Sequence, residues 1–359
     1  NIEILSPLTI KIIFVQQGHS RMKRLFIIIC ILFACLRLLA QTGGDNTYEF
    51  LNLTHSAFAA ATGGLTVSQS RNDLSLPYHN PALLNSSMRN DIALSYSRYL
   101  AGVNYGYAAY GFGHDSVNNY AVGIGYVNYG SFTEADEAGN ITGTFTAAEY
   151  AFNLIYSRCL DSMFTVGVDV KPVLSHLEKY FSAGICADIG VTYINKDALL
   201  SAGLVIKNAG FQIKSYTGDH SEPLPFEIQA GVTKQLAHAP LRFTLTLRHL
   251  EKYDLTYDYN TDDETGSNSV GENILRHMVL GVELLPVKNF WAGAGLNYQR
   301  RSELKTATRA GSAGLSWGFG FNARAFTLAF GRDRYHLAGA ANHFSLVLYP
   351  EMILKNHRR

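Results

Sequence analysis

From Asn90 almost to the C-terminus, the sequence alternates apolar residues with small or polar ones in short runs separated by turns. In the run from Phe164 to Lys171, Phe and three Val residues occupy the even-numbered positions, and Thr, Gly, Asp and Lys occupy the odd-numbered positions. A period of two places successive side chains on opposite faces of a β-strand. Fourteen such runs follow one another between residues 90 and 349, so the sequence predicts an all-β fold of fourteen antiparallel strands.

An even number of strands suits a closed barrel, in which the first and last strands pair and leave no edge. A soluble β-sandwich also alternates, with its apolar face inward, and is the competing fold. The second face of the runs favours the barrel, because it combines Gly, Ser, Thr and Asn with mixed charges that suit a polar lumen. The sequence therefore predicts a transmembrane outer-membrane β-barrel over residues 90–349, with a lumen polar set of Asp169, Lys171, Asp188, Arg242, Arg248 and Glu283.

Composition agrees with this fold. Only 16% of the residues are charged and 12% are aromatic, and no apolar run after Gln41 approaches the ~18–20 residues of a spanning helix. Tyrosines near the strand ends, such as Tyr126 and Tyr129, are expected in aromatic girdles at the membrane interfaces. The long polar segments 130–145, 208–224 and 254–272 are expected to be outer loops, either simply solvated or docking a partner.

The residues ahead of the barrel begin like an export signal. Residues 22–40 join a basic start to an apolar run that ends at Ala40, which is the pattern of a secretory signal peptide. Residues 1–21 are expected to be translated upstream sequence outside the native fold. Residues 1–40 hold five basic residues and one acidic residue, and the whole chain has a net charge of +1, so the remainder carries −3. This balance does not indicate a nucleic-acid partner.

No motif of a catalytic, cofactor or metal site stands out. The histidines form no HxH or HxxxH pair, and the sequence has no GxSxG motif and no phosphate-binding loop. Gly-x-Gly pairs lie inside predicted strands and are read as packing positions of the lumen. Cys159 and Cys186 fall on different predicted strands and are expected to be isolated thiols. The sequence predicts a protein that is not an enzyme and binds no cofactor or metal.

Residues 41–89 form the one long stretch after the signal that lacks strand periodicity. Thr54 is placed to cap one or two helical turns, Gly63-Gly64 ends them, and Pro81 fixes a turn before the first strand. A barrel of fourteen strands is wide enough to need a filling. We therefore predict that this segment is an N-terminal plug or hatch inside the barrel, and a fixed plug is favoured over a gate.

The runs YEFLNLTHSAFAAATGG and NDLSLPYHNPALLN resemble the start of the PorQ family of the type IX secretion system in Bacteroidetes, which is similar to PorV and to the FadL long-chain fatty-acid channels. The resemblance covers about 45 residues and implies a hatch motif of Gly63, Gly64, Asn80, Pro81 and Ala82. It implies a barrel that anchors a PorZ-like surface protein in an attachment complex with a PorU/PorV-like sortase complex. Outer-membrane lipid or lipopolysaccharide is the further implied partner.

The sequence departs from this family in places and leaves other functions open. Thr62 stands where a Leu is expected before Gly63, and a tail of residues 350–359 follows the last predicted strand. The main alternative is a FadL-like channel for hydrophobic small molecules, with Asn80-Pro81-Ala82 in a movable hatch. A purely structural barrel or porin is the third hypothesis.

Overall fold

The computed structural model describes residues 46–113, 115–218, 220–255, 270–303, 312–336 and 339–356. The chain divides into two compact units, 1–41 and 42–359, and the second contains the strands described here. The predicted signal peptide lies outside the described residues, as does most of the predicted loop 254–272.

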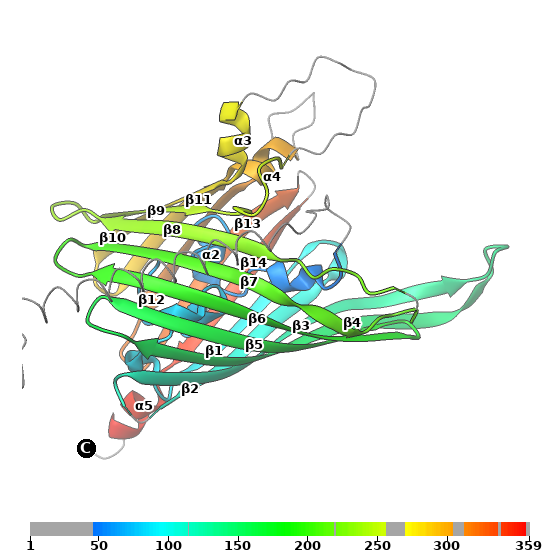
Figure 1. The fold of residues 1–359 in the computed structure, drawn as a ribbon, viewed down its shortest axis with the longest axis horizontal. Coiled ribbons are helices and arrows are strands. Elements are labelled where there is room, and N and C mark those ends of the chain that lie inside the picture. Colours follow the sequence, from blue (N-terminus) through cyan, green and yellow to red (C-terminus); the bar gives the residue numbers. More distant parts are fainter. Residues whose placement is uncertain are drawn as a thin grey trace, which may run out of the picture. The chain divides into compact units, whose positions relative to one another are not determined.

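Fourteen antiparallel strands close into one barrel (Figure 1), as the period of two predicts. Neighbours along the chain are neighbours in the wall, and β1 closes it against β14, with Ile92 opposite Leu348 and Arg98 opposite Asn342. The prediction of a fourteen-stranded barrel is confirmed. The strands are β1 Ile92–Arg98, β2 Asn104–Phe112, β3 Asn118–Ala135, β4 Ile141–Cys159, β5 Phe164–Leu177, β6 Tyr180–Asn195, β7 Leu200–Lys214, β8 Glu227–Gln235, β9 Leu241–Leu247, β10 Met278–Val287, β11 Phe290–Asn297, β12 Leu315–Asn322, β13 Phe326–His336 and β14 Gly339–Leu348.

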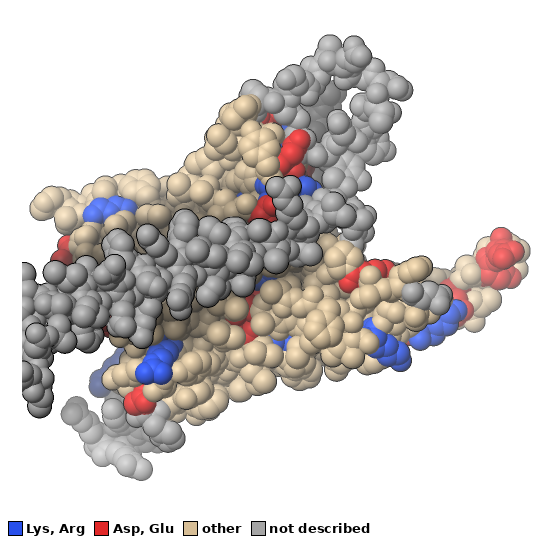
Figure 2. Space-filling model, viewed as in Figure 1, with Lys and Arg blue, Asp and Glu red and all other residues tan. Residues whose placement is uncertain are grey.

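The outward face of the wall is apolar. On β12, for example, Trp317, Phe319 and Phe321 are each about half exposed, at 51%, 46% and 48%. A continuous belt of exposed large apolar side chains around a closed β-wall is the surface that faces hydrocarbon in membrane barrels. The flank visible in Figure 2 is mostly free of charge, and charged residues gather toward the strand ends. Among the described residues, no helix is long and apolar enough to cross a membrane.

The barrel has two different rims. The rim with the start of β1 and the end of β14, here called the terminal rim, has short turns such as those between Cys159 and Phe164 and between Val287 and Phe290. The opposite rim, here called the loop rim, carries the longer connections. Its helices are η5 Leu100–Gly102, α3 Val270–Arg276 and α4 Tyr298–Glu303. Residues 350–356 of the expected tail form helix α5, Pro350–Asn356, at the terminal rim.

One of the predicted outer loops is largely strand, and a second is partly strand. β3 ends at Ala135 and β4 begins at Ile141, so 130–145 is a long hairpin rather than a loop. Its Thr-rich sequence looks like a loop in polarity, but Thr and Phe are good strand formers. Similarly, β7 continues to Lys214 and takes up the first part of 208–224. The alternation is broken there because Asn208 adopts a positive φ of 55° beside a register shift.

A β-bulge explains why one aromatic residue, Tyr129, does not lie on the outward face expected for it. Tyr129 is the extra residue between Asn128 and Gly130 in the β3–β4 register, and its hydroxyl donates to Glu149 Oε2 at 2.5 Å on the lumen side. The prediction that Tyr129 lies in an outer girdle is therefore wrong, because the bulge turns it inward. Tyr126, three residues earlier, is exposed on the outward face as expected.

Residues 46–91, here called the plug, fill the inside of the barrel with short helical turns. Ser56 caps α2, since its Oγ accepts from Ala59 N at 3.4 Å, whereas Thr54 donates to Gly64 O at 2.6 Å. The prediction of Thr54 as the cap is wrong, because a cap must directly precede the first helical residue, here Ala57. The turns are η1 Glu49–Asn52, α2 Ala57–Ala61, η2 Leu76–Tyr78, η3 Pro81–Leu83 and η4 Ser86–Met88.

Candidate functional site

The plug rests directly on glycines of the inner wall. A Cβ atom built on Gly190 of β6 would collide with Asn80 Oδ1, and one on Gly203 of β7 would collide with the carbonyl oxygen of Val67. Both contacts would be well inside the 3.0 Å that real Cβ atoms essentially never cross. Only glycine therefore allows the plug backbone to approach these strands so closely. We call this contact the first seat.

The second seat holds α2 and the turn after it. Cβ atoms on Gly295 of β11 and Gly331 of β13 would collide with Gly63 and with the backbone of Ala57. Ser316 on β12 accepts a hydrogen bond from Gly63 N at 2.9 Å and donates to Ala61 O at 3.1 Å. Gly63 and Gly64 have φ values of 108° and 91°, so glycine is required there, and they end α2 as predicted.

Asn80, Pro81 and Ala82 of the expected hatch motif form a compact turn on the first seat. Asn80 Oδ1 accepts from Ala82 N at 3.0 Å, while its Nδ2 donates to Val67 O at 2.8 Å. Pro81 begins η3, where it has no amide hydrogen to satisfy. Thr192 on β6 donates to Ala82 O at 3.0 Å. The expected motif is therefore divided between two seats, with Gly63 and Gly64 on the second.

The six expected lumen residues all lie on inward positions, but they form three groups. In the first group, Lys171 Nζ is 2.6 Å from Asp188 Oδ1 and donates to Asn208 Oδ1 at 2.6 Å. Asp188 also accepts from Asn208 N at 2.7 Å, which supports the positive-φ bulge. Asp169 Oδ2 accepts from Asn153 Nδ2 at 2.6 Å. The three side chains are fully buried, and each makes at least one hydrogen bond, which offsets part of the cost of burial.

The other two groups involve partners that the sequence does not reveal. Glu283 Oε2 lies 3.4 Å from Arg242 and 3.3 Å from Arg71, and the Arg71 guanidinium lies 4.1 Å from the centre of the Phe58 ring. Arg71 belongs to the plug, so this pair joins plug and wall. Separately, Arg248 Nε lies 3.2 Å from Glu227 Oε1.

Tyr78 is the plug residue that sequence reasoning missed in the first group. Its ring centre lies 5.3 Å from Lys207 Nζ, 6.0 Å from Lys171 Nζ and 4.4 Å from the His55 ring. Its hydroxyl donates to Leu51 O at 2.9 Å. Lys207 continues the alternation of β7, so the sequence predicts that its side chain points inward. The approach of Tyr78 to both lysines depends on the folded plug and had no signal in the sequence.

A different part of the inner wall, here called the apolar arc, is formed by β2, β3 and parts of β4 and β5. Near the loop rim, Tyr48, Phe50 and Leu51 of the plug pack on four of its residues, with Cys186 of β6 and Leu224 in the same cluster. Toward the terminal rim, Leu74, Leu84 and Met88 pack on the rest. Tyr105 and Tyr107 are successive inward residues of β2, and each belongs to one of the two clusters. The wall residues of the arc are Tyr105, Tyr107, Ala109, Ala121, Val127, Ala151, Ile155 and Val173.

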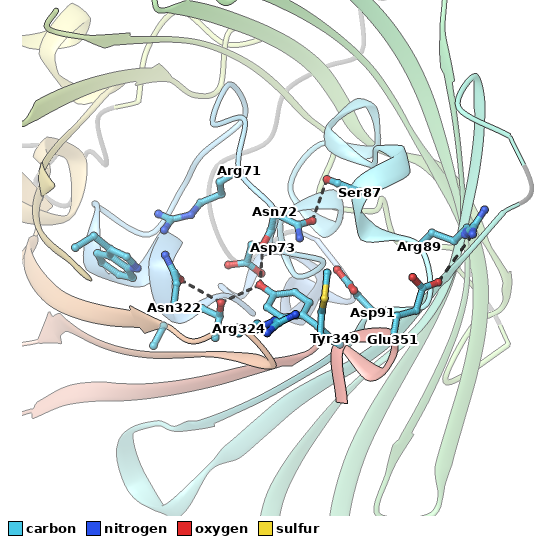
Figure 3. Close-up of a pocket in the computed structure, with 14 residues that line it drawn as sticks. Arg71, Asn72, Asp73, Ser87, Arg89, Asp91, Asn322, Arg324, Tyr349 and Glu351 are labelled. Carbon is cyan, nitrogen blue, oxygen red and sulfur yellow. Dashed lines mark hydrogen bonds and ion pairs between the residues drawn. The ribbon is translucent and has the colours of Figure 1, made fainter. Parts of the chain in front are cut away.

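At the terminal rim the plug leaves a polar cavity of about 400 Å³, shown in Figure 3. Arg71, Asn72 and Asp73 line one side, and Tyr349 and Glu351, at the start of α5, line another. Asp91, which precedes β1, also faces it. Burial raises the pKa of Asp91 to about 7, and the nearby Glu351 carboxylate adds to the shift.

The described part of the chain contains no group of three His, Cys, Asp or Glu residues arranged to hold a metal ion. Cys159 and Cys186 are not bonded to one another.

No family model matches this chain, and no curated protein matches it. Among solved structures, it is similar to a mutant of the TodX monoaromatic hydrocarbon channel, at 14% identity over 84% of this chain and 98% of that one, with a TM-score of 0.49. It is similar to the Pseudomonas putida toluene transporter TodX, at 12% identity over 82% and 96%, with a TM-score of 0.47. It is also similar to a Pseudomonas aeruginosa FadL homologue, at 11% identity over 82% of this chain and 97% of that one, with a TM-score of 0.43. Values this low assign neither a family nor a function.

Proposed function

We propose that this protein is an outer-membrane barrel that passes small hydrophobic molecules along its apolar arc when part of the plug moves. The observation that carries the proposal is the pair of apolar clusters on the inner wall, one toward each rim, with Tyr105 and Tyr107 of β2 as successive inward residues of the two. A lumen that conducts sugars or ions is lined by solvated polar groups. Here charged groups such as Lys171 and Asp188, and Arg242 and Glu283, form ion pairs, and the plug covers two apolar clusters of the wall.

The outer membrane is the location that suits this wall. A closed β-wall satisfies all its strand hydrogen bonds internally, and the apolar belt meets hydrocarbon. The export signal expected at residues 22–40 agrees with such a location.

The first stretch of the plug is the part best placed to move. Tyr48, Phe50 and Leu51 cover the apolar arc mainly through apolar contacts. The hydrogen bonds of this stretch to the rest of the chain include Tyr48 with Ser182, Thr47 N to Pro223 O at 2.9 Å, Tyr78 to Leu51 O, and Asn208 Nδ2 to Asn52 Oδ1 at 3.1 Å. Apolar contacts are not directional, so a hydrophobic solute can replace those that the plug gives up. The two glycine seats meanwhile hold the rest of the plug in place.

A second function is favoured by the tight fit of the plug. A plug held at two glycine seats and by the Arg71–Glu283 pair also suits a fixed scaffold. In this alternative the barrel anchors a PorZ-like surface protein beside a PorU/PorV-like sortase complex, as the resemblance of the plug sequence implies. In this alternative, the partner binds the long β3–β4 hairpin at the loop rim.

The two functions differ in what happens when the plug is locked. We would introduce Thr47→Cys with Pro223→Cys, since their backbones are hydrogen-bonded, and express the chain in cells that lack their own hydrocarbon channels. Uptake of radiolabelled toluene or palmitate should exceed that of empty cells, fall to the empty-cell level on oxidation and return on reduction. Each single-cysteine variant is the matched control. Uptake that never exceeds the empty-cell level contradicts the channel and leaves the scaffold as the better account.

A further inference from the structure

The β3–β4 hairpin continues beyond the barrel wall as a two-stranded ribbon, residues 130–146, visible in Figure 1 as the longest projection of the labelled strands. The register of β3 with β2 ends at the pair Asn128 and Asn104, and that of β4 with β5 ends at the pair Ala147 and Leu177. Beyond these pairs, the described strand pairing joins β3 and β4 only to each other. The Gly130–Ala135 stretch of β3 is therefore an open strand edge.

The two faces of the ribbon are inverted relative to the wall. Within the wall, the outward pairs of β3 and β4 are apolar, as in Tyr126 with Tyr150 and Ile124 with Phe152. In the ribbon, the outward pairs are Ser131 with Thr146 and Thr133 with Thr144. A face without apolar side chains is not built for hydrocarbon, so the ribbon stands outside the membrane.

The opposite face of the ribbon, which continues the inner face of the wall, carries an aromatic pair and, at the next pair toward the tip, Glu134 opposite Gly143. Phe132 and Phe145 are paired across the strands, with ring centres 5.2 Å apart and planes 18° from parallel. Phe132 is 42% exposed although it lies outside the membrane region. Exposed aromatic pairs on a soluble surface are typical of contact sites.

The charge of the ribbon is entirely acidic. It carries Glu134, Asp136 and Glu137 and no Lys, Arg or His, and its tip is coloured by acidic atoms in Figure 2. Asn140 donates from its side chain and backbone to Asp136 and holds the pKa of that carboxyl below its usual range, so it stays charged. Two such ribbons would repel one another, and lipid phosphates would be repelled as well. The charge therefore selects a basic partner.

We propose that the ribbon is a docking site for a basic, extended segment of a partner protein, which adds a strand along the open edge of β3 and packs apolar side chains on Phe132 and Phe145. Strand addition supplies backbone hydrogen bonds, and alternate side chains supply the selection. A Lys- or Arg-bearing strand with alternating apolar residues fits both the apolar pair and the acidic tip. The inference deepens the scaffold alternative and rests on it for the existence of a surface partner.

The test uses the full chain, purified into nanodiscs, and a fluorescent eight-residue peptide of alternating Lys and Val. The peptide should bind saturably by fluorescence anisotropy, and added salt should weaken binding. A Glu–Val peptide and a Lys–Val peptide with a central Pro should bind at least tenfold more weakly. Phe132→Thr with Phe145→Thr should cause a similar loss, whereas Thr133→Ser with Thr144→Ser, the matched pair on the other face, should cause none. No saturable binding, or full binding by the double Phe variant, overturns the proposal.

A second measurement does not depend on any variant of the barrel. A photoreactive group on a central Val of the Lys–Val peptide should label residues 130–135, as located by mass spectrometry. Labelling elsewhere overturns the proposal. Because these measurements involve no solute uptake, a negative result concerns the ribbon alone, and the uptake experiment above succeeds or fails independently.

Discussion

The inner wall of the barrel has two arcs that hold the plug in different ways. The charged arc, carried by β5 to β10, contains buried wall pairs such as Lys171 and Asp188, and it holds the plug through the pair of Glu283 with Arg71. The apolar arc contacts the plug through apolar side chains, and such contacts do not depend on a particular direction. Both are present on β5, where Lys171 and Val173 are successive inward residues. The contrast shows how one plug can be held by an ion pair on one side, while its apolar contacts on the other side can be replaced by those of a hydrophobic solute.

The largest expected effect comes from breaking the charged arc. Lys171→Met should lower the free energy of unfolding by about 3–5 kcal/mol, because it leaves the buried Asp188 carboxylate without its ammonium partner. Urea-induced unfolding in detergent micelles measures the change. Val173→Ala, two residues along the same face, removes two methyl groups and should cost only about 2 kcal/mol. Equal losses for the two variants would remove the distinction between the arcs.

Closing the first seat should have the next largest effect. Gly203→Ala places a Cβ against the carbonyl oxygen of Val67, and the plug must shift, at a cost of about 1–3 kcal/mol. Reaction of a thiol-specific reagent with a cysteine introduced at Ser68 should become several-fold faster. Gly113→Ala is the matched control, since its added Cβ meets neighbours only at ordinary contact distances. Unchanged labelling in the Gly203 variant would mean that the plug does not rest on this glycine.

The turn on the first seat should give a smaller effect. Asn80→Ala removes the cap of η3 and the hydrogen bond to Val67 O, and should cost about 0.5–2 kcal/mol. The same unfolding assay measures it. Asn85→Ala removes a similar cap at the exposed turn η4 and serves as the comparison. A larger loss for Asn85 than for Asn80 would contradict the role of the seat.

Asp91 belongs to neither arc, and its contribution lies in the pH dependence of stability. Because burial raises its pKa to about 7 in the folded chain, the folded state retains a proton that the unfolded state loses near pH 4. Stability should therefore fall as the pH rises from about 4 to about 7. Asp91→Asn should remove this part of the pH dependence when unfolding is measured across that range. An unchanged pH profile would indicate that Asp91 is already ionised in the folded barrel.

Much of the wall could be predicted from the sequence, because lipid outside and a filled lumen inside impose a strict period of two. The same period placed Lys171, Asp188 and Glu283 on the inner face. Their partners could not be predicted, since they depend on the strand register and on the bulge at Asn208. The segment 130–145 was misread because, outside the membrane, a strand no longer needs an apolar outward face.

The plug was harder to predict than the wall. Its Gly63-Gly64 stop follows from local backbone chemistry and was expected. The seats depend on wall glycines such as Gly190 and Gly203, more than a hundred residues away in sequence. In the alternating strand pattern these glycines look like any other small inward residue. The sequence around them therefore gives no sign that the backbone of the plug lies against them.

The most direct test of the central claim is a map of where a hydrophobic solute contacts the inner wall. A small diazirine-bearing hydrocarbon, photolysed with the full chain in nanodiscs and located by mass spectrometry, should label inward residues of the apolar arc such as Tyr105, Val127 and Val173. Excess toluene should compete this labelling, while labelling of outward residues such as Phe152 should persist. Labelling confined to outward residues, or spread equally over the inward positions of β7 to β9, would contradict the account.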